Sequence, residues 1–573
     1  MVITRPKLIV AAAAFRMGFA MVLCLIAPIF AAAQSKPSAP TEPEAQNCAA
    51  LADLNLEDAP GGPALITSAR LVDVPPSGLE QWLVIPSGYG STSSQIATRI
   101  HQYCEVAGYV APQNKFLLRL PRPSDWNQNF FFTACGGYCG YLDGRRCNLA
   151  LARGYASATG NGGHDSGMGF DGVWAANAPE LQEDFGWRSN HVVTLIAKGI
   201  TMHYYGKSIK HSYMAGNSKG GQAVLLEAQR FPNDFDGLMP SAPVHEYTAR
   251  NTIAAAWFAQ AVSDGHGGSV LNAAAAEAVH KSVLDHCGAQ AGVEEGLVTD
   301  PPSCKWRPEM IACASGSSGS DCLNAKQVAA VKRLMTPATN SKGEILYPYP
   351  YIPGTETQWQ GVNYPGAPFP GYPLMMFANP DMAGQYLKYF LDEKAREKGD
   401  ALSFDFDRDP ATLDRARRIY DATSVDLRAF KARGGKMLMW HGWADGAIMA
   451  TSSIGYYESV LKFMGGRKQT ENFFRLFLVP GVHHGGGGPG LTEFDALTAL
   501  ENWVEKGQPP EKLIACRSAN GVVERCRPVF PYPVLARYSG NGDPKDAGSF
   551  VAFDPARNSA SPAATFGEKP PMH

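Results

Sequence analysis

The stretch SYMAGNSKGGQAV (212–224) is the most informative about the fold, because it places a serine between two glycines where an apolar run gives way to a helix-like segment. A G-x-S-x-G turn between a strand and a helix is typical of a nucleophile elbow, which exposes the serine hydroxyl at the edge of a sheet. Here KHSYMA precedes the turn and predicts a strand. GGQAVLLEAQRFP follows it and predicts a helix that Pro232 ends. The stretch therefore predicts that Ser218 is a nucleophile.

Two later segments supply the partners that such a serine needs to lose its proton. MLMWHGWADG is an apolar run that ends in a loop with Asp445, and FLVPGVHHGGGGPG ends in a Gly-rich loop with His483 and His484. Taken singly, the aspartate could cap a turn and either histidine could be an ordinary loop residue. In α/β hydrolases, however, the triad runs along the chain as Ser, Asp or Glu, then His. We therefore expect a triad of Ser218, Asp445 and one of the two histidines.

The oxyanion formed during acyl transfer requires backbone N–H donors. One donor is expected from Lys219, the residue after the nucleophile. The other is expected from the Gly-rich loop TACGGYCG, through Gly136 or Gly137. A plain turn is the alternative interpretation of these glycines.

The chain has two strand-rich parts separated by a segment of different character. From about Tyr247 to about Ala422 the sequence has an alanine-rich helix, cysteine-bearing loops and a run rich in proline, glycine and aromatic residues. We predict an α/β-hydrolase fold with a central, mostly parallel sheet and a large inserted lid domain. The predicted divisions are a signal peptide (1–33), the first part of the hydrolase domain (34–246), the lid (247–422), the second part of the hydrolase domain (423–549) and a disordered tail (550–573).

The first residues have the pattern of an export signal, with three basic residues, a short apolar run (17–30) and the small residues AAAQ. We expect cleavage after Ala33 and a secreted or periplasmic protein with no stable membrane anchor. A retained anchor is the alternative. The mature chain would keep eleven of the twelve cysteines, because Cys24 lies in the signal. Plausible bridges are Cys287 with Cys304, Cys313 with Cys322, and Cys516 with Cys526; we expect the unpaired thiol among Cys135, Cys139 and Cys147.

The overall composition is that of an ordinary globular protein, with 45% hydrophobic and 18% charged residues. The formal net charge is -2, and no long basic run is present. These values argue against nucleic acid as the main partner.

In the order and number of its motifs, the sequence resembles the tannase and feruloyl esterase family, which also includes the enzyme that hydrolyses mono(2-hydroxyethyl) terephthalate. The resemblance covers nearly the whole mature chain. The matching runs are YCEVAGYVAP (103–112), YYG (204–206), SYMAGNSKGGQ (212–222), AQRFPNDFDGLMPSAP (228–243), DFDRDP (405–410), HGWADG (441–446), VPGVHHGGGGPG (479–490) and YPVLARYSGNGD (532–543). The resemblance implies an α/β-hydrolase domain with an inserted lid and hydrolysis of esters, often of aromatic acids.

The chain departs from this family at two positions beside the expected triad. Family members have a cysteine directly before the nucleophile and another directly after the catalytic histidine, and the two form a disulfide. The first position here is Asn217, and the second is Gly485 if His484 is the catalytic histidine. The joint absence of both cysteines favours His484 over His483. Hydrogen bonds of Asn217 could then help to hold the loops.

A second departure concerns the calcium loop of the family lid. The matching segment, CGAQAGVEEGLVTDPPSC (287–304), has Gly288, Ala291 and Glu295 at the three carboxylate positions. Calcium takes six to eight oxygen ligands, several of them charged. We therefore expect no tight calcium site and no cofactor.

The resemblance and the triad pattern lead to one main hypothesis: an exported serine esterase that hydrolyses carboxylic esters of aromatic acids (hydroxycinnamic, gallic or related) through the triad and an acyl-enzyme, with a small-molecule aromatic ester as its substrate. The alternative is a non-catalytic exported binding protein derived from this fold. The side chain of Lys219 is expected to point to solvent; it could instead attract a carboxylate of the substrate.

Overall fold

The computed structural model divides the chain into two units, 1–40 and 41–573. The described residues all belong to the second unit and are 42–80, 95–166, 171–266, 268–314, 319–359, 380–391, 400–519 and 522–555. The predicted signal segment (1–33) lies outside them. Within the described residues, no helix has both the length and the apolar character of a membrane span.

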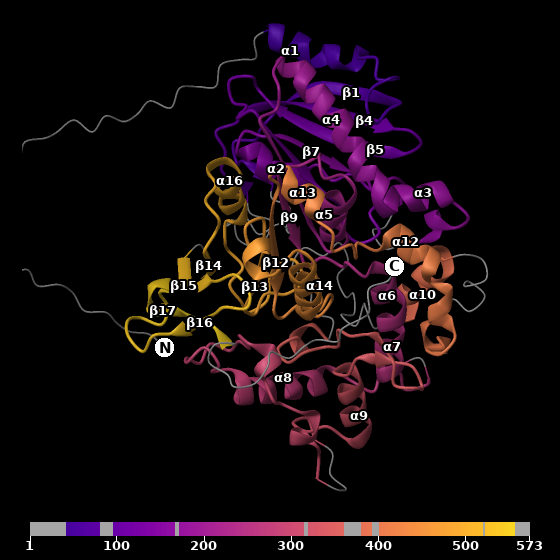
Figure 1. The fold of residues 1–573 in the computed structure, drawn as a ribbon, viewed down its shortest axis with the longest axis vertical. Coiled ribbons are helices and arrows are strands. Elements are labelled where there is room, and N and C mark those ends of the chain that lie inside the picture. Colours follow the sequence, from indigo (N-terminus) through magenta and orange to yellow (C-terminus); the bar gives the residue numbers. More distant parts are fainter. Residues whose placement is uncertain are drawn as a thin grey trace, which may run out of the picture. The chain divides into compact units, whose positions relative to one another are not determined.

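The centre of the fold is a nine-stranded sheet (Figure 1). In spatial order its strands are β1 (Ala64–Asp73), β4 (Gln102–Val110), β5 (Asn114–Pro121), β7 (Ala156–Gly160), β6 (Asn129–Thr133), β8 (His211–Asn217), β9 (Gly237–Ser241), β12 (Lys436–Gly442) and β13 (Phe474–Val479). The first three pairings are antiparallel, and every pairing from β7 to β13 is parallel. This confirms the predicted mostly parallel sheet of an α/β hydrolase.

Helices bury both faces of this sheet. One face packs against α4 (Ser189–Tyr205), α5 (Lys219–Arg230) and α14 (Ala450–Phe463), and the other against α2 (Arg145–Ala152) and α16 (Ala496–Lys506). Successive strand residues alternate between the two apolar cores, so Met214 belongs to the first core and Tyr213 to the second. Burial on both faces explains the uninterrupted apolar runs of the central strands β6, FFF (130–132), and β12, MLMW (437–440).

The segment from 247 to 422 has an apolar core of its own. Its helices include α6 (Tyr247–Ala249), α7 (Ala255–Val262), α8 (Ala273–Cys287), α9 (Ala325–Leu334), α10 (Pro380–Tyr389) and α12 (Asp414–Tyr420). That core also contains Tyr138, from the loop after β6, and Ile448, from the loop after β12. The insertion therefore packs directly on the two loops in which the sequence predicts catalytic groups.

The C-terminal part extends further than expected. After the hairpin of β14 (Leu513–Ala519) and β15 (Val522–Val529), the strand β16 (Leu535–Tyr538) pairs with β17 (Phe550–Phe553). The predicted tail from residue 550 is thus wrong in its first residues, because antiparallel pairing with β16 orders them. Residues 556–573 lie outside the described part.

Five disulfides cross-link the described residues. The three proposed bridges are confirmed, and two further ones join Cys48 to Cys104 and Cys135 to Cys139. Cys147, one of the three candidates for the unpaired thiol, is free and buried.

Candidate active site

Ser218 occupies the sharp turn between β8 and α5. Its backbone has φ 63° and ψ -121°, a conformation that non-glycine residues rarely adopt and that is typical of a nucleophile elbow. The flanking glycines are required by space. A Cβ on Gly216 would lie 2.5 Å from the carbonyl carbon of Gly220, and one on Gly220 would lie 2.9 Å from the carbonyl oxygen of Cys135. The predicted elbow is therefore present in the backbone geometry.

Asp445 and His484 meet above the carboxyl ends of neighbouring strands. Asp445 follows β12 and His484 follows β13, and Nδ1 of His484 lies 2.7 Å from Oδ2 of Asp445. The aspartate is fully buried, whereas the side chain of His484 keeps 16% of its surface exposed. The neighbouring His483 points elsewhere, with its Nε2 2.8 Å from Oγ1 of Thr357. The structure thus pairs His484 with Asp445, and Ser218 directly follows β8 at the same edge of the sheet.

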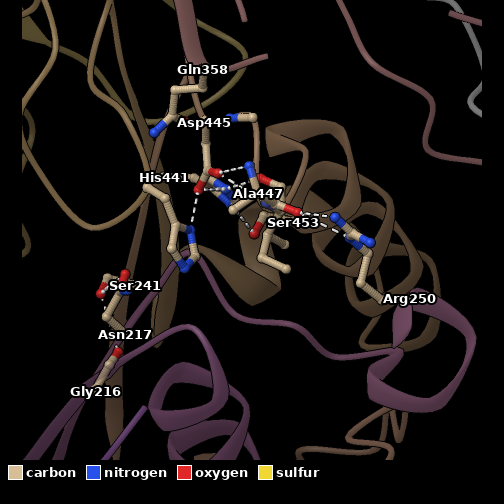
Figure 2. Close-up of polar contacts among 12 residues, drawn as sticks. Gly216, Asn217, Ser241, Arg250, Gln358, His441, Asp445, Ala447 and Ser453 are labelled. Atoms are coloured by element: carbon tan, nitrogen blue, oxygen red, sulfur yellow. Dashed lines mark hydrogen bonds and ion pairs between the residues drawn. The ribbon is translucent and has the colours of Figure 1, made fainter. Parts of the chain in front are cut away.

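The Asp445 carboxylate accepts four hydrogen bonds (Figure 2). Oδ1 accepts from the backbone N–H groups of Ala447 and Ile448 at 2.8 and 2.9 Å. Oδ2 accepts from His484 and from a second imidazole, His441, at 3.1 Å. Burial alone would raise the pKa of Asp445, but the attraction of His484 and the hydrogen bonds from both imidazoles outweigh it and lower that pKa. The carboxylate therefore stays ionised, as orientation of a catalytic imidazole requires.

His441 is a member of this network that the sequence patterns did not indicate. Its Nε2 lies 2.8 Å from the carbonyl oxygen of Ile448, which can only accept, so Nε2 carries the proton. Its Nδ1 then accepts from the hydroxyl of Ser453, 2.8 Å away. This arrangement fixes the tautomer and directs the same N–H toward Asp445. The one available signal was a histidine four residues before the aspartate in HGWADG.

Two residues of the insertion hold the loop that carries Asp445. Nε and Nη2 of Arg250, in the π-helical turn η4 (Arg250–Ala254), donate to the carbonyl oxygen of Ala447 at 3.0 and 2.5 Å. Oε1 of Gln358 accepts from the N–H of Gly446 at 2.6 Å. Figure 2 shows both side chains converging on this loop. No local pattern in the sequence could have indicated these partners, which come from positions far along the chain.

The predicted oxyanion loop lies against the elbow. The N–H of Ala134 donates to the carbonyl oxygen of Ala215 at 2.9 Å, which continues the pairing of β6 with β8. A Cβ on Gly136 would lie 3.6 Å from the carbonyl oxygen of Asn217. Gly137 has a φ of 64°. The structure thus brings Gly136, Gly137 and the backbone of Lys219 to the neighbourhood of Ser218.

The side chain of Lys219 contradicts the expectation of a solvent-exposed group. Only 2% of its surface is exposed. Its Nζ donates to Oε1 of Gln222 at 2.7 Å and lies 4.6 Å from the ring centre of Phe185 and 5.9 Å from that of Tyr247. Burial lowers the pKa of the Lys219 ammonium to about 7. The expectation was wrong because Phe185, from the first part of the chain, and Tyr247, at the start of the insertion, cover the Lys219 side chain.

Asn217 does form hydrogen bonds, but with a neighbouring strand. Its Oδ1 accepts from the hydroxyl of Ser241 at 3.1 Å, which ties the end of β8 to the end of β9. Gly485 has a φ of 73°, where a side chain would be strained. A Gly485→Cys substitution would therefore introduce backbone strain at this position.

Two of the three positions that match the family's calcium loop, Ala291 and Glu295, are engaged with protein partners. The carboxylate of Glu295 pairs with the guanidinium of Arg527, and the Glu295 carbonyl oxygen accepts from Arg525 at 3.3 Å. The carbonyl oxygen of Ala291 accepts from the N–H of Tyr538 at 2.8 Å. A guanidinium beside the carboxylate opposes cation binding by charge, in line with the expectation of no tight calcium site.

Elsewhere in the described residues, one group of possible metal ligands comprises His191, Glu227 and Asp234. Nδ1 of His191 lies 2.6 Å from Oδ2 of Asp234. That separation is a hydrogen bond and is shorter than the spacing of two ligands around one tetrahedral metal ion with bonds of about 2 Å. As arranged, the group is a hydrogen-bonded cluster, and it belongs to α4 and the region around the end of α5.

Thermal stability is expected to be insensitive to a calcium chelator, because Glu295 is already paired with Arg527 and two of the three carboxylates are missing. The measurement is the Tm with EGTA and with added calcium. A clear fall in Tm with EGTA that calcium reverses would contradict it.

Lys219→Met should increase stability relative to the wild type more at pH 6 than at pH 9. At pH 6 the ammonium is charged in both states, so the folded protein carries the full cost of burial. Between the folded pKa of about 7 and the ordinary value of 10.5 the wild type releases its proton on folding and gains stability as pH rises. Calorimetry should show the Tm difference between variant and wild type shrinking by about 2 °C or more from pH 6 to pH 9. A pH-independent difference would refute this.

His441→Phe should lower kcat about tenfold with little change in KM, because Asp445 loses one of its four donors and with it part of its orientation. Ser453→Ala is the milder matched variant: it keeps the imidazole and its Nε2–H but removes the hydrogen bond that Nδ1 accepts, and should give an intermediate kcat. Steady-state kinetics of both variants checks the order. Wild-type turnover in His441→Phe would show that the hydrogen bond from His441 to Asp445 does not contribute to kcat.

Comparison with known proteins identifies relatives of this chain. A family model described as tannase and feruloyl esterase matches residues 97–553. The mono(2-hydroxyethyl) terephthalate hydrolase of Piscinibacter sakaiensis is 31% identical over 532 residues, which cover 80% of this chain and 86% of that protein. A probable feruloyl esterase B-2 of Aspergillus terreus is 29% identical over 486 residues, covering 80% and 87%.

Solved structures show the same fold. Feruloyl esterase B from Aspergillus oryzae aligns with a TM-score of 0.74 at 24% identity, covering 89% of this chain and 100% of that chain. Tannin acyl hydrolase from Aspergillus niger aligns with a TM-score of 0.68 at 20% identity, covering 86% and 92%. The family match spans well over half of the sequence. The chain therefore belongs to the tannase and feruloyl esterase family of carboxylic ester hydrolases.

Proposed function

We propose that this protein is an exported serine esterase that hydrolyses carboxylic esters of aromatic acids through Ser218, His484 and Asp445. The observation that carries the proposal is the 2.7 Å contact between Nδ1 of His484 and the buried, ionised carboxylate of Asp445. The elbow conformation of Ser218, on the same edge of the sheet, supports it.

The reaction proceeds in two halves. Oγ of Ser218 attacks the ester carbonyl while Nε2 of His484 takes its proton, and Asp445 stabilises the resulting imidazolium. The N–H of Lys219 and that of Gly136 or Gly137 stabilise the tetrahedral oxyanion. Collapse expels the alcohol, which receives the proton from His484, and leaves an acyl-enzyme. Water activated by His484 then attacks the acyl-enzyme, releases the acid and restores Ser218.

The aromatic acid in this proposal is supported by the relatives, which are named for feruloyl esters and for mono(2-hydroxyethyl) terephthalate. Export is supported by the basic and apolar start of the sequence and by five disulfides, which persist in oxidising compartments. A panel of methyl ferulate, methyl gallate and mono(2-hydroxyethyl) terephthalate ranks the acids and alcohols within this class.

Ser218→Ala should abolish hydrolysis of the panel and leave the Tm close to that of the wild type, because only the attacking oxygen is removed. His484→Ala should lower kcat by a factor on the order of 10⁴, and far more than His483→Ala, whose imidazole contacts Thr357 and not Asp445. Steady-state kinetics of the three variants beside the wild type is the test.

Two outcomes would overturn the assignment. Near-wild-type turnover in Ser218→Ala would exclude this nucleophile, and a greater loss in His483→Ala would move the base to that residue. A wild type that binds aromatic esters without hydrolysing any of them would favour the alternative, a binding protein built on this fold.

A further inference from the structure

The disulfide between Cys135 and Cys139 has an unusual place among the five. It joins residues only four apart and encloses Gly136, Gly137 and Tyr138. Both cysteines are almost fully buried, with 4% and 1% of their surface exposed. The enclosed glycines are the ones expected to supply the second oxyanion donor.

The bridged loop touches the nucleophile elbow directly. Ala134, immediately before the bridge, pairs with Ala215 in β8, and the carbonyl oxygen of Cys135 lies 2.9 Å from where a Cβ on Gly220 would stand. The first turn of α5 and the start of the bridged loop are therefore in backbone contact. A shift of the loop would change the distance between its N–H groups and the carbon that Ser218 attacks.

The sequence of this loop has little conformational preference of its own. Two consecutive glycines have access to most of the allowed backbone conformations, so an open Gly136–Gly137 segment would sample many orientations of its N–H groups. In the structure Gly137 has a φ of 64°, and Cys139 has a φ of 57°, which is uncommon for a residue with a Cβ. The N–H of Cys139 donates to the carbonyl oxygen of Gly136 at 3.1 Å and closes a turn.

The bridge is fixed from outside by the loop after β7. A Cβ on Gly162 would lie 2.9 Å from Sγ of Cys139 and 3.1 Å from Sγ of Cys135, so only a glycine lets this backbone pack on the sulfurs. From the insertion, the hydroxyl of Tyr247 lies 3.5 Å from the carbonyl oxygen of Gly137. The disulfide thus connects the oxyanion loop to rigid surroundings.

We propose that the Cys135–Cys139 disulfide is a positioning element of the active site: it holds the N–H groups of the Gly136–Gly137 segment in the orientation that stabilises the oxyanion. This inference rests on the proposed function, because it assigns the oxyanion donor to this loop. Donors act in catalysis to the extent that they are already oriented before charge develops.

This role differs from that of the other disulfides in what its loss should change. In the chain-entropy account, a bridge stabilises the fold more when it closes a longer loop. Cys135–Cys139 closes the shortest of the five, whereas Cys48–Cys104 spans 56 residues. Removal of the Cys135–Cys139 bridge should therefore affect turnover more than thermal stability.

The test compares two double variants. Cys135→Ser with Cys139→Ser removes the bridge, and Cys313→Ser with Cys322→Ser removes a bridge of separation nine in the insertion as the matched control. We expect kcat to fall about tenfold or more in the first variant and to stay within about twofold of the wild type in the control, with KM little changed in both. The affinity for an aryl trifluoromethyl ketone, whose adduct with Ser218 carries an oxyanion, should fall in parallel with kcat.

A second variant provides the same test if the double variant Cys135→Ser with Cys139→Ser does not fold. Cys135→Ala with Cys139→Gly removes the bridge and places glycine where the backbone has a positive φ, so it relieves the strain at that position. It should have the same low kcat with a Tm close to that of the control.

The outcomes separate the two proposals. Turnover and ketone affinity of the folded bridge variants within about twofold of the control would overturn the positioning role while leaving the serine esterase in place. A wild type without Ser218-dependent hydrolysis would overturn both.

Discussion

The arrangement of the proposed active site depends on one buried carboxylate, that of Asp445. Asp445 is fully covered, so its charge is tolerated only because four donors surround it. Two of them come from its own loop, one from the end of β12 and one from the loop after β13. Satisfying this charge therefore fixes the loop of the aspartate and the imidazole of His484 at the same time.

The insertion also holds the loop of Asp445 in place. Arg250 and Gln358 hold the backbone on the C-terminal side of the aspartate through Ala447 and Gly446. The apolar core of the insertion also takes in Tyr138 and Ile448 from the two loops. A substitution at Arg250 or Gln358 can thus change the orientation of the proposed catalytic groups.

The chain distributes its covalent links differently from what the family resemblance implies. Where a disulfide would join the serine and histidine loops, Asn217 bonds to Ser241 and Gly485 adopts a positive φ. A disulfide instead closes the loop that faces the nucleophile from β6, between Cys135 and Cys139. The links near Ser218 are thus a short disulfide and a hydrogen bond between neighbouring strands, in place of a disulfide between the two loops.

Features that depend on near neighbours and on chain order could be predicted from the sequence. The elbow at Ser218, the strands that carry Asp445 and His484, and three disulfides of short separation follow from local patterns. The contact of His441 with Asp445, the support from Arg250 and the burial of Lys219 emerged only from the tertiary structure. The support from Arg250 depends on how the insertion packs on the loop of Asp445. The burial of Lys219 depends on Phe185 and Tyr247, which are distant from it in the sequence. The contact of His441 is local, but a histidine four residues before an aspartate does not by itself indicate that the two side chains meet. Burial is set by segments distant in sequence, which leave no periodic signal at the residue itself.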